Sequence, residues 1–234
     1  DNCYGYISGS DSYPELFVGR FSAENETEVS TQVNRTIKYE KYPQLGATWY
    51  GRAVGIASDQ GPGDDNEMDF EHIRNIRSKL LNYGYNDVAE FYDGSQGQQD
   101  AAGNPNAQMV VTELQSGVGI LNYTGHGSNN GCSSSGLSSA EVDALTNTDA
   151  FPFFFSVACV NGNFVGITCF AESWLRATDN ASGEPTGAIG TYMATINQSW
   201  NPPMSGQDEM NDLLTEANLN NIKRTFAGIG MNGC

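Results

Sequence analysis

Two apolar runs decide the fold of this chain: GILNYTGHG at residues 119–127 and FPFFFSVACVNG at residues 151–162. Short apolar runs bounded by glycine and polar residues are typical of strands buried on both faces, as in a parallel sheet covered by helices. Ligands of such sheets bind beyond the carboxyl ends of the strands. The sequence places His126 and Cys159 at these ends. An imidazole and a thiol at equivalent strand ends indicate a cysteine-nucleophile enzyme.

Each of these two residues also has an ordinary structural interpretation. A cysteine after an aromatic strand is commonly a small buried apolar residue, and a GHG sequence is commonly a tight turn. The chain has only two histidines, however, and one of them stands at the same kind of strand end as the cysteine. Their joint position therefore favours catalysis.

Composition argues against two classes of partner. The 234 residues are enough for one large domain, or slightly more, with a real core. There are 28 acidic and 11 basic residues, giving a net charge of −17, which would repel nucleic acid and anionic membranes. This charge suits a secreted protein, divalent cations or basic substrates, although a solvated acidic surface explains it equally well. No run approaches the roughly 20 apolar residues of a membrane span.

The cysteine count is odd. In an oxidising compartment it allows two disulfides and one free thiol, which we expect to be the reactive one. No CxxC or Cys/His cluster has the spacing of zinc ligands, so the sequence does not predict a structural zinc site. The five cysteines are Cys3, Cys132, Cys159, Cys169 and Cys234.

Strand and helix alternate from residue 53 onward, which predicts an α/β, three-layer fold with a mainly parallel sheet flanked by helices. Besides the two apolar runs, we expect strands at 52–58, 88–92 and 187–193, and two extended segments at 4–7 and 16–21. Helices are expected at 26–41, 68–83, 107–115, 138–145, 170–178 and 207–217. In the first of these, Val29, Val33 and Ile37 recur every four residues, which indicates an amphipathic helix.

Several motifs, taken together and in order, resemble the gingipains, and the arginine-specific kind more than the lysine-specific kind. They are YTGHGS (123–128), VACVNG (157–162), TINQSW (195–200), GQDEMN (206–211) and NIKRTF (221–226). The family consists of secreted bacterial cysteine endopeptidases with a caspase-like fold. The resemblance implies that residues 1–45 end an N-terminal α/β subdomain and that 46–234 form a caspase-like catalytic subdomain, truncated at its C-terminus.

The resemblance also implies roles for the residues at the strand ends. Cys159 would be the nucleophile and His126 the general acid/base. The thiolate would attack the scissile carbonyl while the backbone N–H groups of Gly127 and Cys159 stabilise the oxyanion. The imidazole would then protonate the leaving amine. A side chain at Gly127 would crowd the substrate carbonyl.

Three further residues match the specificity pocket of the family. Asp69 would lie at the floor and pair a substrate guanidinium through two parallel hydrogen bonds. Trp200 would stack on the arginine side chain and Gln198 would line the pocket. From the sequence alone, Asp69 is better explained as a carboxylate favoured by a helix N-terminus. Gln198 would by itself be a loop residue and Trp200 a core residue.

The chain departs from the family pattern in two places. Gln60 stands where the family has a glutamate that orients the histidine, with Asp59 beside it. We expect Gln60 to point toward the histidine and Asp59 toward the acidic loop at 64–67. The segment at 129–136 also lacks the Glu and Trp of the family, and a Cys132–Cys169 disulfide is an alternative way to hold that side of the pocket.

The family binds structural calcium. Here Glu67, in the acidic loop at 64–67, and Glu172 can supply hard oxygen ligands, although a solvated acidic loop is an equally good explanation. No catalytic cofactor is expected.

The function predicted is a secreted or cell-surface cysteine endopeptidase that cleaves after Arg through a thioester acyl-enzyme, acting on protein or peptide substrates. Two alternatives remain open. A sortase-like transpeptidase of the same fold would resolve the same thioester with an amine instead of water. A catalytically weak, calcium-stabilised binding module is favoured by the lost glutamate and disfavoured by the presence of both His126 and Cys159.

Overall fold

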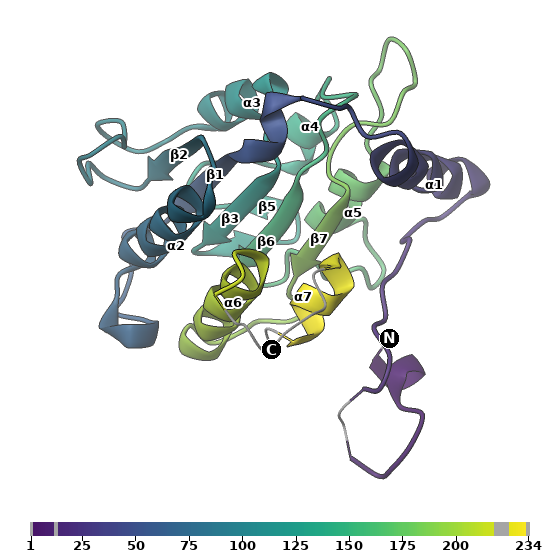
Figure 1. Ribbon diagram of the computed structural model, residues 1–234, viewed down its shortest axis with the longest axis horizontal. Coiled ribbons are helices and arrows are strands. Elements are labelled where there is room, and N and C mark those ends of the chain that lie inside the picture. The colour runs from purple at the N-terminus through teal and green to yellow at the C-terminus, as the bar shows by residue number, and fades with distance from the viewer. Residues whose placement is uncertain (1, 12–13, 218–224, 233–234) are drawn as a thin grey trace.

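A parallel sheet forms the centre of the molecule (Figure 1). The computed structural model describes residues 2–11, 14–217 and 225–232; Cys234 and most of the motif at 221–226 lie outside them. The sheet has five strands in the order β2-β1-β3-β6-β7, and every neighbouring pair is parallel. The strands are β1 (Arg52–Ala57), β2 (Asp87–Tyr92), β3 (Ile120–Thr124), β6 (Phe153–Val157) and β7 (Gly190–Met193).

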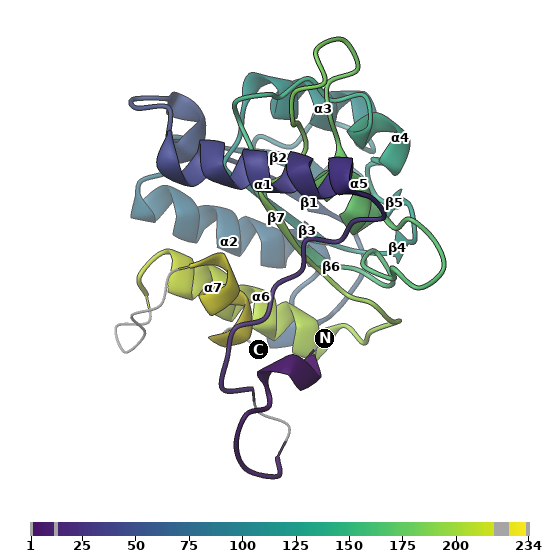
Figure 2. The same cartoon turned by 90° about the vertical axis from the view of Figure 1, so that its right-hand side faces the viewer.

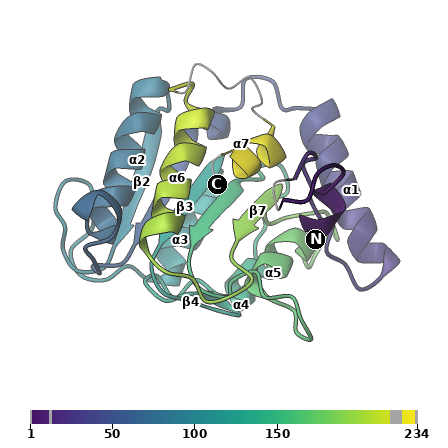
Figure 3. The same cartoon turned by 90° about the horizontal axis from the view of Figure 1, so that it is seen from below.

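Helices cover both faces of this sheet and give the molecule three layers, as the alternation of elements predicts (Figures 1 and 3). One core cluster joins the sheet to α3 (Ala107–Ser116), α4 (Ser139–Val142) and α5 (Phe170–Arg176). A second cluster joins the other face to α2 (Asp69–Tyr83), α6 (Asn201–Leu214) and α7 (Phe226–Asn232). Short elements complete the chain: 3-10 turns η1 (Asn2–Gly5), η2 (Thr48–Gly51) and η3 (Asp64–Asn66), and a hairpin of β4 (Gly127–Ser128) and β5 (Gly131–Cys132).

The N-terminal segment differs from the prediction. Neither 4–7 nor 16–21 forms a strand: the first lies in η1 and continues as irregular chain, and the second has no regular structure. Leu16, Phe17 and Phe21 are exposed. A strand needs a neighbour to bond its backbone groups, and in the described residues this segment runs away from the sheet (Figure 2). The division of the chain near residue 45 stays a prediction.

Helix α1 (Glu26–Lys41) has the predicted bounds but not the predicted inner face. Val29 and Ile37 are exposed, and the buried residues are Thr31, Gln32 and Arg35. The Arg35 guanidinium donates to backbone carbonyls around the end of α5 and the start of β7, those of Trp174, Leu175, Ala177 and Ala188. Burial lowers the pKa of Arg35 to about 9. Hydrogen bonds from Arg35 to carbonyls at the C-terminal end of α5, which lack partners within that helix, thus replace the expected apolar contact.

Helix α6 begins at Asn201, six residues before the predicted start at Gln207. Pro202 and Pro203 lie in its first turn, where the missing N–H groups have no intrahelical partners to lose. Trp200 consequently occupies the N-cap position, and its side chain makes no capping hydrogen bond there.

The register of β3 and β6 sets up the site. Thr124 pairs with Val157 at the last position of both strands, and the N–H of Gly125 donates to the carbonyl of Val157 at 3.1 Å. The two chains therefore leave the sheet side by side, and the segments at 125–128 and 158–161 emerge at the same edge.

Candidate active site

His126 and Cys159 follow the carboxyl ends of adjacent parallel strands, as predicted. Cys159 is partly buried, and its Sγ lies 3.7 Å from the backbone oxygen of Gln198. His126 is exposed, and its ring meets the indole of Trp200 edge to face, with centroids 4.9 Å apart and planes at 77°. The structure thus brings Trp200 and Gln198, predicted from a distant motif, to the same place as the imidazole and the thiol.

Gly127 is required by the packing of one loop on the other. A Cβ at this position would lie 2.8 Å from both Ala158 Cβ and the carbonyl oxygen of Cys159, and 2.9 Å from Asn161 Nδ2. Real Cβ atoms do not approach backbone so closely, so any other residue would push the histidine loop away from the nucleophile. The predicted role of its N–H toward an oxyanion stays a prediction.

Asn161 was not singled out from the sequence, yet it ties the two loops together. Its side chain is fully buried. Its Nδ2 donates to the carbonyls of Ser128 and Gly131, at 2.7 and 3.0 Å, and its Oδ1 accepts from Ser156 Oγ at 2.9 Å. The available signal was an asparagine just after a buried strand, because a buried amide has to find partners for all its polar atoms.

Hydrogen bonds to its backbone hold the histidine loop in place. The Tyr123 hydroxyl donates to the carbonyl of His126 at 2.5 Å, and the N–H of Ser133 donates to the same oxygen at 3.0 Å. Across the described part of the chain, no hydrogen bond reaches the imidazole of His126. The backbone of the loop is therefore held by hydrogen bonds, whereas the ring contacts the protein through its packing against Trp200.

Asp69, the predicted pocket floor, is the first residue of α2 and is completely buried. Its Oδ1 accepts from the indole Nε1 of Trp200 at 2.6 Å, and its Oδ2 accepts from the hydroxyl of Ser58. Burial raises the pKa of Asp69, while the two hydrogen bonds and the nearby His72 and His126 work in the opposite direction. Asp69 thus begins a helix, as one interpretation predicts, and its carboxylate also faces Trp200; its pairing with a substrate guanidinium stays a prediction.

Trp200 closes the pocket above Asp69. Its indole N–H bonds to the carboxylate while its ring edge meets His126, and the crevice beside Cys159, Gln198 and Trp200 has a volume of only about 10 Å³. The Nε2 of Gln198 is buried without a hydrogen-bond partner. Because Asp69 is completely buried and its Oδ1 is bonded to the indole, a guanidinium can reach this carboxylate only if the indole moves.

Gln60 does not take the place predicted for it. Its side-chain amide donates to Asp59 Oδ1 at 3.1 Å, and its backbone oxygen accepts from the N–H of Asp69 at 2.9 Å. Both Gln60 and Asp59 are exposed. The expectation that Gln60 orients His126 is therefore not met in this structure, because its amide is engaged by the adjacent carboxylate and its backbone supports the start of α2 instead.

The two candidate calcium ligands line different clefts. The Oε1 of Glu172 accepts from Arg176 at 2.6 Å and from Ser22 at 2.5 Å, and its Oε2 accepts from the N–H of Cys169 at 3.0 Å. A carboxylate already neutralised by a guanidinium is a poor cation ligand. Glu67, in contrast, lies in an acidic cleft between η3, α2 and α6.

Cys132 and Cys169 carry free thiols, so the proposed disulfide between them is wrong. Cys132 lies on β5 inside the core and Cys169 precedes α5, and both are buried. Burial raises the pKa of each thiol, which keeps them protonated and unreactive. Cys159, only partly buried, stands apart from them at the edge of the sheet.

A thiol, an imidazole and a buried carboxylate gather at the carboxyl edge of a parallel sheet, an arrangement typical of α/β enzymes with a cysteine nucleophile. The model of peptidase family C25 matches residues 1–233. Gingipain R2 of Porphyromonas gingivalis is 43% identical over 236 residues, which cover 100% of this chain and 31% of that protein. Lys-gingipain of the same species is 27% identical over 185 residues, 78% of this chain and 10% of the other.

Solved structures agree with these sequence matches. The crystal structure of the Arg-specific cysteine proteinase gingipain R superposes with a TM-score of 0.92 at 42% identity, covering 100% of this chain and 52% of that one. The complex of the pro- and mature domains of RgpB from Porphyromonas gingivalis gives 0.90 at 42% identity and covers 53% of that chain. The chain therefore belongs to peptidase family C25 and has the caspase-like fold expected from the resemblance, while spanning about a third of gingipain R2 and half of the solved chain.

None of the described helices is long and apolar enough to cross a membrane.

Proposed function

We propose that this chain carries the catalytic centre of a cysteine endopeptidase that cleaves after arginine. The observation that carries the proposal is the convergence of Cys159, His126 and Trp200 above the buried carboxylate of Asp69. Membership of peptidase family C25 and the similarity to the gingipains R support it.

In the proposed reaction, His126 takes the proton of the Cys159 thiol, and the thiolate attacks the carbonyl carbon of the arginine to form a tetrahedral intermediate. Its collapse expels the amine, which takes a proton from His126, and leaves a thioester on Cys159. Water, deprotonated by His126, then hydrolyses the thioester. The backbone N–H groups of Gly127 and Cys159 are the proposed donors to the oxyanion, and the tight packing of Gly127 on Cys159 holds them close together.

Specificity for arginine follows from the chemistry around Asp69. A planar guanidinium can replace the indole N–H on Oδ1 and stack against the displaced ring, whereas a lysine ammonium has neither the fork nor the planar face. Opening the pocket would also bring Gln198 Nε2, which has no partner now, close to the substrate.

We also propose that calcium binds this chain and that the protein acts outside the cell on protein or peptide substrates. The family resemblance and the acidic charge of −17 support both. The oxygen cluster that fits a hard cation best is formed by Asp64, Asp65 and Asp208, whose ligand atoms lie within 4.8 Å of one another. Glu172 fits poorly, because its oxygens are already bonded.

Labelling with a peptidyl arginine acyloxymethyl ketone tests the proposed function. We expect stoichiometric modification of Cys159, located by peptide mass spectrometry, and none in Cys159→Ala; the matched lysine reagent should react far more slowly. Cys3 is also exposed and free, so Cys3→Ser is the control for nonspecific alkylation. Equal reaction with both reagents, or labelling that Cys159→Ala retains, would rule the proposal out. Added amine acceptors separate hydrolysis from transpeptidation by product mass.

A further inference from the structure

A cluster of buried polar side chains lies beneath the active-site edge of the sheet. Elsewhere the layer between the sheet and helices α2 and α6 is apolar. A buried polar group costs stability unless its hydrogen bonds are made, and apolar side chains would fill the same space without that cost. The members of the cluster, all buried, are His72, Asn122, Thr124, Gln207 and Asn211.

Gln207 of α6 lies at the centre of this cluster and uses both ends of its amide. Its Nε2 lies 3.3 and 3.4 Å from the backbone oxygens of Tyr123 and Phe155. Because carbonyl oxygens can only accept, the orientation of the amide is fixed. Its Oε1 is therefore the acceptor, from the Thr124 hydroxyl at 2.6 Å and from His72 Nε2 at 3.1 Å.

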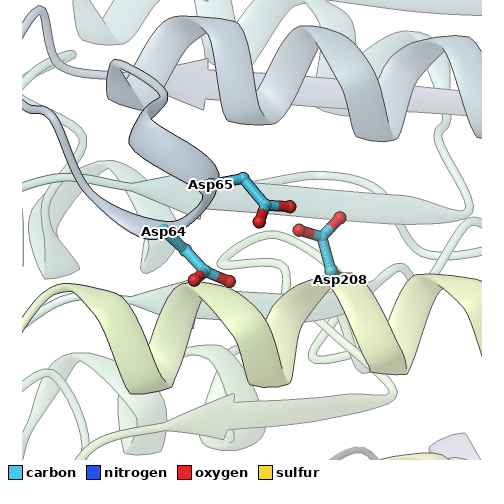
Figure 4. Close-up of side chains that lie close together, drawn as sticks. All are labelled: Asp64, Asp65 and Asp208. Atoms are coloured by element: carbon cyan, nitrogen blue, oxygen red, sulfur yellow. The ribbon is translucent and has the colours of Figure 1, made fainter.

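A second amide of α6 extends the same contact. Asn211, one turn after Gln207, exchanges two hydrogen bonds with Asn122 of β3, at 3.1 and 3.0 Å. Gln207 Nε2 also lies 3.1 Å from Asn122 Oδ1. Asp208, the next residue of the helix, points instead toward the carboxylates of η3 (Figure 4). The side of α6 that faces the sheet is thus joined to β3 by amides, and the cleft lies on another side.

Gln207 connects the three segments on which the candidate active site is built. Strand β3 leads to His126, strand β6 leads to Cys159, and α6 begins directly after Trp200. Apolar packing has no preferred direction, whereas a hydrogen bond fixes a distance and an angle. The amide of Gln207 therefore limits how far α6 can slide along the two strand ends.

We propose that Gln207 is a positioning residue, whose bond to Thr124 sets the place of Trp200 relative to His126 and Cys159. The inference rests on the proposed function, since it concerns the same site. The connection is short: Gln207 follows Trp200 by about two helical turns, roughly 10 Å along the axis, and Thr124 precedes His126 by two residues. A displacement of about 1 Å in a catalytic site can cost on the order of 100-fold in rate.

Three variants test this bond from both sides, with an arginine amide as substrate. Gln207→Met keeps the length of the side chain without its polar atoms and should lower kcat about tenfold or more. Thr124→Val removes one hydroxyl and should lower kcat about threefold to fivefold, whereas Thr124→Ser keeps the hydroxyl and should stay within about twofold of the parent. Thr124→Val should fold, because Gln207 Oε1 keeps His72 as a donor.

Asn147 offers a matched control at the opposite edge of the sheet. It too is a buried amide, and its Nδ2 donates to the carbonyls of Ala150 and Gly187, just before β6 and β7 begin. Asn147→Ala should lower the urea unfolding midpoint at least as much as Thr124→Val. Because it lies far from the site, it should change kcat by less than about twofold.

The indole N–H signal of Trp200 in NMR spectra reports the position of α6 without any chemistry. The chain has three tryptophans, so the signal is assigned by its absence from Trp200→Phe. We expect it to shift in Gln207→Met and Thr124→Val and to keep the parent position in Thr124→Ser and Asn147→Ala.

The two readouts separate this inference from the proposed function. A parent protein that does not cleave the arginine amide would count against the proposed function alone, and the indole signal would still decide on Gln207. If Gln207→Met does not fold, the two Thr124 variants decide. The positioning role is overturned if the indole signal and kcat of Thr124→Val match the parent, if Thr124→Ser loses as much as Thr124→Val, or if Asn147→Ala lowers kcat equally.

Discussion

The two histidines of this chain both lie near the carboxyl end of β3 and are held in different ways. His126, beyond the end of β3, is exposed, and only its backbone is fixed. His72 is buried under the same strand end, where Gln207 joins it to the hydroxyl of Thr124. An exposed ring can reach a substrate and exchange protons with it, whereas the buried ring is held in place by its contact with Gln207. The contrast separates a reactive site from a supporting one.

Replacing each histidine in turn is the strongest test of these different roles. His126→Gln should lower kcat/KM for an arginine amide about 1000-fold, because general acid–base catalysis contributes roughly 10²–10⁴. It should leave the free energy of unfolding within about 0.5 kcal/mol, since the side chain is exposed. His72→Gln should instead cost about 1–3 kcal/mol of stability. Both variants are measured by steady-state kinetics and by urea unfolding. Similar unfolding midpoints for the two variants would contradict the different roles assigned to the two histidines.

Asp69→Asn should lower kcat/KM for arginine substrates by about 100-fold, since the guanidinium would lose its counter-charge. The same change should stabilise the protein at pH 7. Burial raises the pKa of Asp69 in the folded state, so its contribution to stability is present below the unfolded pKa of about 3.9 and is lost as the pH rises through the folded value. Urea unfolding at pH 7 and pH 3 should show a gain that disappears in acid. A loss at pH 7 would mean that the bonds from Ser58 and Trp200 outweigh burial.

Asn161→Ala tests whether the loops carrying the two reactive groups depend on a buried amide. The variant loses three side-chain hydrogen bonds and leaves the carbonyls of Ser128 and Gly131 without this donor. We expect a loss of about 3 kcal/mol in stability and a roughly tenfold fall in kcat with little change in KM. Asn163→Ala, in the same loop but only partly buried, is the control. A fall in KM alone would argue against a positioning role.

Trp200→Phe should produce a smaller effect, visible as a shift in pH dependence. The indole hydrogen bond lowers the pKa of Asp69, so its loss should raise that pKa. A guanidinium binds only the ionised carboxylate, and the acid limb of kcat/KM should therefore move to higher pH. The measurement is the pH profile of kcat/KM for an arginine amide, recorded for the parent protein and for Trp200→Phe. If the acid limbs of the two profiles coincide, the indole does not affect the pKa of Asp69.

The smallest effect is expected from Gln60→Ala, because the Gln60 side chain bonds to Asp59 and not to His126. The change in kcat should stay below about twofold, and Asp59→Ala should behave in the same way. A tenfold loss in either variant would restore that residue as the partner that orients His126.

Most of the fold could be predicted because the strands and the helices that follow them each have a recognisable hydrophobic pattern. Continuous apolar runs marked β3 and β6, and the strand-end rule then located the thiol and the imidazole without any structure. The N-terminal segment failed because local pattern cannot show whether a neighbouring strand exists. Arg35 was hidden for a related reason: its partners are carbonyls more than 100 positions away.

The supporting residues of the site were harder to predict than the reactive ones. Asn161 was part of a recognised motif, but its role depends on where the β4–β5 hairpin lies. His72 lies on the inward face of α2 beside Ile73 and Ile76, where a polar residue gives no sign of its distant partners on α6. The prediction for Gln60 was wrong because a match to the family's glutamate position does not show which neighbour the Gln60 amide bonds to.

The closed indole gives the proposed peptidase a selection step before any chemistry. If the open pocket is a minor state, the apparent affinity of every substrate is reduced by the fraction of molecules that are open. An arginine recovers this loss, because its guanidinium supplies the hydrogen bonds that Asp69 gives up when Trp200 leaves. A neutral side chain has nothing to offer a buried carboxylate and would leave it unpaired. Rejection of uncharged residues would then depend less on the shape of the pocket than on the population of molecules in which the pocket exists.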